Sequence, residues 1–169
     1  MDTYYLTLRP SSLNRLYSNI LQMARDVNTN AQVFPTKGSI IIMAFQTRDI
    51  SPIVEILDKW DLEYPYNFID NMEMKIIEED QICHTIVFEA KLNPNFEEKL
   101  SILHKNISEK LEPSIGFPGC FIVYRGNKDI EIMNYIEKNL KEFNKGEWLI
   151  TINKQGSAPL YIKDRLPQL

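Results

Sequence analysis

The chain of 169 residues has few of the side chains on which catalysis and metal binding depend. It contains two cysteines and two histidines, and it lacks the G-x-x-x-x-G-K, G-x-G-x-x-G, H-E-x-x-H, G-x-S-x-G and C-x-x-C motifs. Cys83 and Cys120 lie in or beside apolar runs without ligand spacing, which predicts buried reduced thiols. His84 and His104 are most simply two unconnected histidines. We therefore expect a binding protein rather than an enzyme, with no catalytic residues, metal or cofactor.

Long apolar runs and an excess of positive charge are also missing. No apolar run approaches the roughly 20 residues that cross a bilayer, and the polar segment from Asp2 onward is unlike a signal peptide. Together with reduced thiols, this predicts a cytoplasmic protein that does not bind membranes. The formal net charge is −4, which argues against direct binding to nucleic acid. The acidity belongs to the first half, because residues 1–83 carry 12 acidic and 7 basic side chains and residues 84–169 carry 11 and 12.

Two stretches about 80 residues apart share one pattern. Residues 38–60 and 119–140 each begin with glycine and continue with an apolar run, a polar turn, a basic-Asp-Ile step and apolar residues at helical spacing. Upstream of each stretch, a strand-like run leads into a helix start rich in Pro, Ser or Asn. This likeness predicts an internal duplication, with pseudo-repeat halves 1–80 and 84–163 inside a single compact domain that spans 1–169.

Apolar periodicity places the expected elements. The predicted strands are 3–9, 39–45, 72–78, 83–90, 120–125 and 148–153, with 160–162 as an edge strand or docked tail. The predicted helices are 12–27, 51–60, 94–111 and 129–143. The order predicts an α+β two-layer sandwich related to the ferredoxin-like β-α-β-β-α-β unit. In it, a mixed sheet of about six strands carries about four helices, mainly on one face.

An aromatic and acidic stretch is the best candidate for binding. Aromatic side chains are good interface anchors, and a surrounding acidic rim steers a basic partner. The predicted partner-binding residues are Trp60, Asp61, Glu63, Tyr64, Tyr66, Phe68, Asp70, Glu73, Glu78, Glu79 and Asp80. Our leading hypothesis is a small cytoplasmic inhibitor, immunity protein or antitoxin. It would occlude a protein partner with a basic surface, such as an enzyme that handles nucleic acid.

An alternative hypothesis comes from Tyr5-Leu6-Thr7 and His84-Thr85-Ile86, which occupy corresponding places in the two halves. They resemble the H-x-T elements that two-histidine phosphoesterases carry in each of two similar halves. The first histidine is replaced by Tyr5, and Thr85 directly follows His84, so those two side chains point to opposite faces of a strand. The resemblance implies a non-catalytic protein that binds nucleotide between the halves, with Tyr5, Thr7, His84 and Arg125 as contacts. A third hypothesis is self-association through an exposed sheet edge such as 148–153. The sequence leaves the oligomeric state open.

Overall fold

Eight strands form two antiparallel sheets in the residues that the computed structural model describes, which are 2–11, 14–27, 31–62, 68–108, 120–144, 147–154 and 157–163. We call them sheet A and sheet B. Sheet A contains, in spatial order, β3 (Ile40–Thr47), β1 (Asp2–Pro10), β7 (Trp148–Lys154) and β8 (Tyr161–Ile162). Sheet B contains, in spatial order, β2 (Gln32–Val33), β6 (Cys120–Asn127), β5 (Cys83–Leu92) and β4 (Ile69–Glu78).

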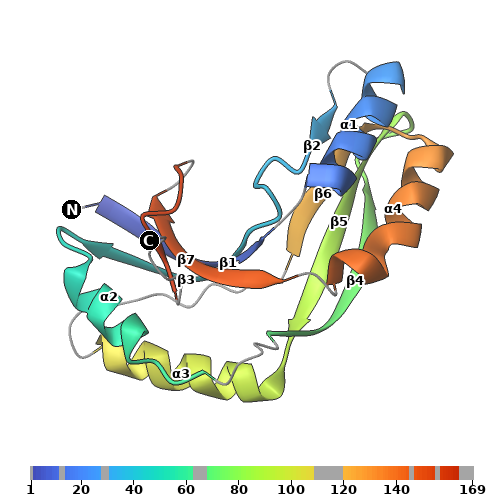
Figure 1. Cartoon of the computed structure of the whole chain (residues 1–169). Helices are drawn as coiled ribbons and strands as arrows, with labels where there is room; N and C mark the ends of the chain where they lie inside the picture. Colours follow the sequence, from blue (N-terminus) through green and yellow to red (C-terminus); the bar gives the residue numbers. More distant parts are fainter. Residues whose placement is uncertain are drawn as a thin grey trace.

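Four helices in the described residues cover one face of each sheet. They are α1 (Asn14–Val27), α2 (Ser51–Asp58), α3 (Pro94–Ser108) and α4 (Ile130–Asn144). Helices α2 and α3 lie against sheet A, and helices α1 and α4 lie against sheet B (Figure 1). The two sheets are inclined to each other, with the helices on their outer sides (Figure 1). The opposite face of each sheet is called its helix-free face below.

Two of the helices begin at a side-chain cap, whereas α2 follows Ile50, which makes no side-chain cap hydrogen bond. Just before α2, the Asp49 carboxylate accepts the backbone N–H of Ser51 at 3.0 Å. At α3, the Asn93 side-chain oxygen accepts the N–H of Asn95 at 2.9 Å. At α4, the Asp129 carboxylate accepts the N–H of Ile132 at 2.9 Å. Each cap satisfies a backbone donor that the first helical turn leaves without a partner, which fixes where the helix starts.

One apolar core joins the two helix-covered faces. Alternation along β1 buries Leu6 and Leu8 completely. In sheet B, the Phe88 ring on β5 lies 5.4 Å from the ring of Phe143 on α4. Because Phe88 points towards a helix, its neighbours on β5 point to the helix-free face.

The predicted α+β class and its four helices are confirmed in the described residues, but the prediction of one mixed sheet is wrong. The six predicted strands and four predicted helices are present within a few residues, but the strands divide between two sheets in which every pairing is antiparallel. Strands β4 and β5 pair as a hairpin, and β5 also pairs with β6. Strand β1 pairs with β3 and with β7, which lies more than 130 residues later in the sequence. Apolar periodicity identifies a strand but not its partner, so it does not distinguish one sheet from two.

Candidate binding site on the helix-free face of sheet B

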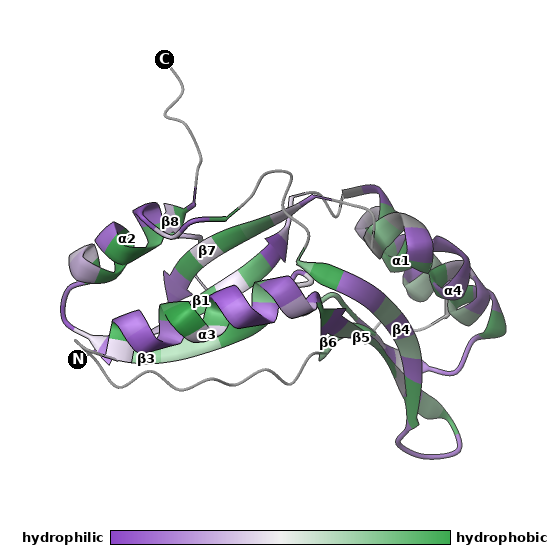
Figure 2. Ribbon diagram, turned by 90° about the horizontal axis from the view of Figure 1, so that it is seen from below, coloured by the Kyte–Doolittle hydropathy of each residue, from purple (hydrophilic) through white to green (hydrophobic). Residues whose placement is uncertain are grey.

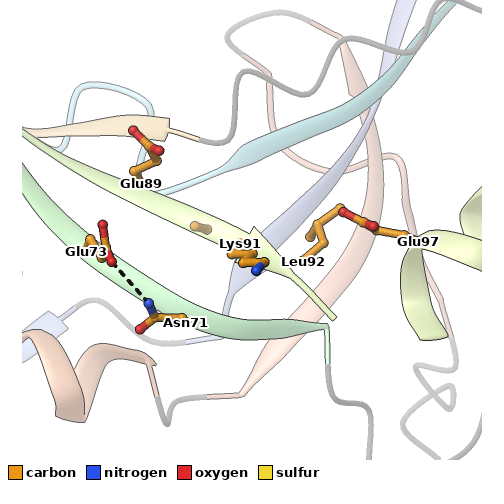
Figure 3. A pocket seen from close by; sticks show the side chains of 7 residues that line it. Asn71, Glu73, Glu89, Lys91, Leu92 and Glu97 are labelled. Carbon is orange, nitrogen blue, oxygen red and sulfur yellow. Dashed lines mark hydrogen bonds between the residues drawn. The ribbon is translucent and has the colours of Figure 1, made fainter. Parts of the chain in front are cut away.

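A pocket lies where the helix-free face of sheet B meets the start of α3. Its volume is about 260 Å³. Side chains from β4, β5 and α3 surround it (Figure 3), namely Asn71, Glu73, Glu89, Ala90, Lys91, Leu92 and Glu97. The strand register accounts for this grouping, because Glu73 lies directly opposite Glu89, and Asn71 opposite Lys91. These four side chains share the face opposite to Phe88.

Carboxylates dominate the lining of this pocket. Glu73, Glu89 and Glu97 contribute three of them, against the single ammonium group of Lys91. Like charges directly across a strand pair are unfavourable, and nearby contacts moderate the Glu73–Glu89 pair. The ammonium of Lys75 lies 2.6 Å from the Glu89 carboxylate, and this contact raises the pKa of Lys75. The lining as a whole remains net negative.

Three carboxylates around one pocket suit an organic cation. Among the residues that the structure describes, no three His, Cys, Asp or Glu side chains form a group that could hold a metal. The pocket volume of about 260 Å³ is close to the lower end of ligand-binding pockets. Carboxylates around such a volume suit a guanidinium or ammonium group at the end of a long side chain.

Two of the predicted aromatic anchors lie in the core. Trp60 is 8% exposed and Phe68 is 3% exposed. Both rings pack on Phe96 of α3, with ring centroids 5.8 Å and 4.7 Å away, and the Trp60 indole donates to the Lys99 carbonyl at 3.2 Å. Their burial corrects the expectation that these two rings are surface anchors. The predicted residues Glu63, Tyr64 and Tyr66 lie outside the described residues.

The predicted acids at the β4–β5 turn are exposed and also brace that turn. Glu78 lies 3.4 Å from the Lys128 ammonium, and Glu79 lies 2.9 Å from the Arg125 guanidinium. The Asp80 carboxylate accepts two backbone N–H groups of the turn, each at 2.7 Å. These hydrogen bonds lower the pKa of Asp80 because they stabilise its charged form.

The remaining predicted acids in the described residues, Asp61 and Asp70, are exposed. The backbone carbonyl of Asp61 accepts a hydrogen bond from the Lys99 ammonium at 3.0 Å. The Asp70 carboxylate accepts one from the Asn93 side-chain amide at 2.8 Å. Within the described part of the predicted set, only Glu73 lines the pocket. Of the predicted acids, Glu73 therefore lies at the pocket, and Glu78, Glu79 and Asp80 lie at the β4–β5 turn.

Of the alternative nucleotide contacts on sheet A, Thr7 already has hydrogen-bond partners inside the protein. Thr7 is buried, and its hydroxyl lies 2.6 Å from the hydroxyl of Thr151. Both hydroxyls also lie 3.3 Å from the side-chain oxygen of Asn153, which is the cross-strand neighbour of the half-buried Tyr5. This network explains how two buried threonines are satisfied on β1 and β7.

The structure does not bring His84 together with the other alternative contacts. Thr85 lies opposite Arg125 on the helix-free face, so the adjacent His84 points to the helix-covered face. There it is 4% exposed, with its ring edge-on to Tyr124. Its Nε2 atom has no hydrogen-bond partner in the described part of the chain. Burial, and next the charge of Lys128, lower the pKa of His84, which favours a neutral ring.

Sequence reasoning missed three of the four charged pocket residues, Glu89, Lys91 and Glu97. The available signal was the alternation of polar residues along an otherwise apolar strand, 83–92, which indicates a second, polar face. The prediction of buried thiols also needs correction, because Cys120 is exposed and Cys83 is half-buried. Cys120 lies opposite Glu89 on the same polar face.

Comparisons of the chain with protein-family models, curated proteins and solved structures found no match. Within the described ranges, none of the helices has the length and apolar character that crossing a membrane requires. The fold alone does not imply a function, so the basis for a function is the geometry and charge of the site.

Proposed function

We propose that the chain is a small binding protein that occludes a partner protein with a basic surface, as inhibitors and immunity proteins do. The observation that carries this proposal is the pocket of about 260 Å³ lined by Glu73, Glu89 and Glu97. An arginine or lysine side chain of the partner enters the pocket and is held by charge-assisted hydrogen bonds. Enzymes that handle nucleic acid are suitable partners, because their substrate-binding surfaces are basic.

The exposed acids outside the pocket support the same proposal by a different route. Asp70 lies near the pocket, and Glu78, Glu79 and Asp80 lie at the far end of β4. Acids arranged in this way create a negative potential that speeds encounter with a positive partner and orients it before contact. Because these charges are exposed, salt weakens the steering strongly, whereas contacts inside the pocket are screened less.

The pocket is tested by removing its three charges without changing its shape. The variant E73Q/E89Q/E97Q is compared with E55Q/E131Q/E137Q, which removes three exposed glutamates from α2 and α4. A partner is first captured from native lysate and identified. Its affinity for the purified chains is then measured by calorimetry at low salt.

We expect the pocket variant to lose about tenfold or more in affinity, the size of a hot-spot contact. The control variant has the same net charge and should stay close to the wild-type chain, after thermal melting has shown that both variants are folded. Equal affinities for the two variants contradict the proposal, because the position of the charges then has no effect.

The second candidate is nucleotide binding between two duplicated halves, and the strand order favours it. In each sheet, the first long strand of one half lies between another strand of that half and the last long strand of the other half. Thus β1 lies between β3 and β7, and β5 lies between β6 and β4. This exchange supports a duplication of 1–80 and 84–163 about an approximate twofold axis. The helix-free faces, with Tyr5 and Arg125, are then the candidate surfaces, whereas the buried Thr7 is bonded to Thr151.

A thermal-shift panel of mononucleotides and cyclic oligonucleotides tests this second candidate. A ligand at 100 times its dissociation constant stabilises the folded chain by about 2.7 kcal/mol. A Tyr5→Ala or Arg125→Ala variant should reduce the shift, and His84→Leu should not change it, because that ring points to the other face. Unchanged melting across the panel rules out this candidate for the ligands tested.

A further inference from the structure

The β4–β5 hairpin is the most projecting part of sheet B. Both strands have ten residues, and their last pair joins Glu78 to His84. In Figure 2 the turn between them extends beyond α4 and beyond the rest of the sheet. A projecting hairpin of this kind can reach into a concave surface that the body of the molecule cannot enter.

Exposed isoleucines lie on the hairpin and at the start of α4, with Ile76 and Ile77 on opposite faces of β4. Four of the eight large apolar side chains that are exposed among the described residues are Ile76, Ile77, Ile82 and Ile130. Ile82 is 67% exposed and Ile130 is 69% exposed. The backbone N–H of Lys128 donates to the Ile82 carbonyl at 2.8 Å, which places the start of α4 beside the turn. Single exposed apolar residues need no explanation, but a group on one projection is typical of an interaction surface.

The hairpin turn is fixed before any partner arrives. The backbone N–H groups of Glu79 and Asp80 both donate to the Cys83 carbonyl, at 3.2 Å and 3.4 Å. The Asp80 carboxylate closes the turn from the other side by accepting the N–H groups of Ile82 and Cys83. A fixed turn presents its apolar side chains without the entropy loss of ordering a loop on binding.

Acidic side chains outnumber basic ones at this end of the hairpin and indicate the chemistry of the partner. Glu78, Glu79 and Asp80 occupy the end of the hairpin, and Asp129 follows close by, while Lys128 and Arg125 are the nearby cations. Apolar contacts inside an acidic rim are complementary to an apolar groove with basic edges.

We propose that the β4–β5 hairpin inserts into an apolar groove of the partner protein, edged by lysine and arginine side chains, and that Ile82 is its leading contact. This inference rests on the proposed function and adds a second contact to it, about the length of β4 away from the glutamate pocket. The pocket holds a basic side chain by charge, and the hairpin supplies the apolar contact area that the buried Trp60 and Phe68 do not.

Photo-cross-linking from the hairpin tests this inference. Benzoylphenylalanine replaces Ile82 in one variant and Ile102 in a control, because Ile102 is 52% exposed and lies on α3. The cross-linked protein is identified by mass spectrometry, produced in pure form, and titrated with the I82D, I77D and I102D variants. Both replaced side chains in the cross-linking pair are exposed, so thermal melting should match the wild-type chain.

We expect a cross-link from position 82 and none from position 102, and an affinity loss of about tenfold or more for I82D, with I102D unchanged. No cross-link from position 82, or equal cross-links from both positions, overturns the inference. So does sedimentation of the chain alone as a dimer that I82D dissociates, because the occupant is then a second copy. If E73Q/E89Q/E97Q binds weakly but I82D binds normally, the hairpin inference fails while the proposed function stands. If I82D binds weakly and E73Q/E89Q/E97Q binds normally, the proposed role of the pocket in binding is contradicted instead.

Discussion

Replacement of Trp60 by alanine separates the two roles that its sequence context allows. As an interface anchor, Trp60 would contribute to affinity and little to folding. As the structure places it, the ring is 8% exposed, lies 5.8 Å from the Phe96 ring, and donates to the Lys99 carbonyl at 3.2 Å. The structure therefore predicts a large loss of stability and a normal affinity in the fraction of molecules that stays folded.

The size of the loss follows from the burial of the ring. Replacing a buried tryptophan by alanine lowers the free energy of unfolding by about 3–5 kcal/mol, of which the lost hydrogen bond accounts for about 1 kcal/mol. For a chain of 169 residues, a loss of this size lowers Tm by about 10 °C. Phenylalanine at the same position keeps most of the ring contact, so W60F should lose about 1–2 kcal/mol.

Urea unfolding followed by circular dichroism measures these changes, since the chain has two tryptophans and W60A removes one fluorescence probe. Wild type, W60F and W60A should unfold at successively lower urea concentrations with similar slopes. The affinity of folded W60A for the partner should equal that of the wild type. A stability loss below about 1 kcal/mol, together with a weakened complex, would refute the assignment of Trp60 to the core.

Other substitutions test the hairpin, the buried histidine and the threonine pair. Because the folded-state pKa of His84 is lowered from 6.5, its contribution to stability is present above that value and is lost as pH falls through the lower folded-state pKa. The free energy of unfolding, measured with urea, should therefore fall more for wild type than for H84L as pH falls from 7 towards 5. An equal fall in the two proteins contradicts this. D80A should raise hydrogen exchange at the β4–β5 turn and leave sheet A protected, whereas uniform exchange throughout the chain argues against a local bracing role. T7V should lose about 1 kcal/mol, and T7V/T151V should lose less than the two single changes together, because each single change also leaves a hydroxyl with fewer partners. Additive losses in calorimetric melting exclude this coupling.

The elements could be predicted from the sequence because each depends on local patterns. The stripe of Phe96, Leu100, Leu103 and Ile107 predicts α3, and all four side chains are buried. The cap at Asn93 and the proline after it mark where that helix starts. Such signals lie within one or two helical turns, so a single sequence carries them.

The pairing of strands could not be predicted, because it depends on contacts between distant residues. Tyr4 lies opposite Lys154, and Leu8 opposite Ile150. Neither β1 nor β7 carries a sequence pattern that identifies the other as its partner, because each pattern indicates only an apolar strand. The division into two sheets follows from such pairings and becomes visible only in three dimensions.

The candidate site was predicted in part, for related reasons. The acids of 70–80 are exposed, as polar residues on a half-buried edge strand usually are. The sequence did not show whether Trp60 and Phe68 are surface anchors or core residues, because an aromatic side chain is equally suited to an interface and to a core. Glu97 was missed because it joins the pocket through the placement of α3 beside β5, which no spacing in the sequence reveals.

The position of β1 has a consequence for how the protein is made. This strand leaves the ribosome before the other strands that the structure describes, yet it lies between β3 and β7 in sheet A and pairs on one side with residues 148–154. Sheet B draws its strands from residues 32–127, so all of them are synthesised before β7. Sheet A is therefore completed last during translation, and until then the free edge of β1 is a strand edge that a chaperone or a neighbouring nascent chain can reach.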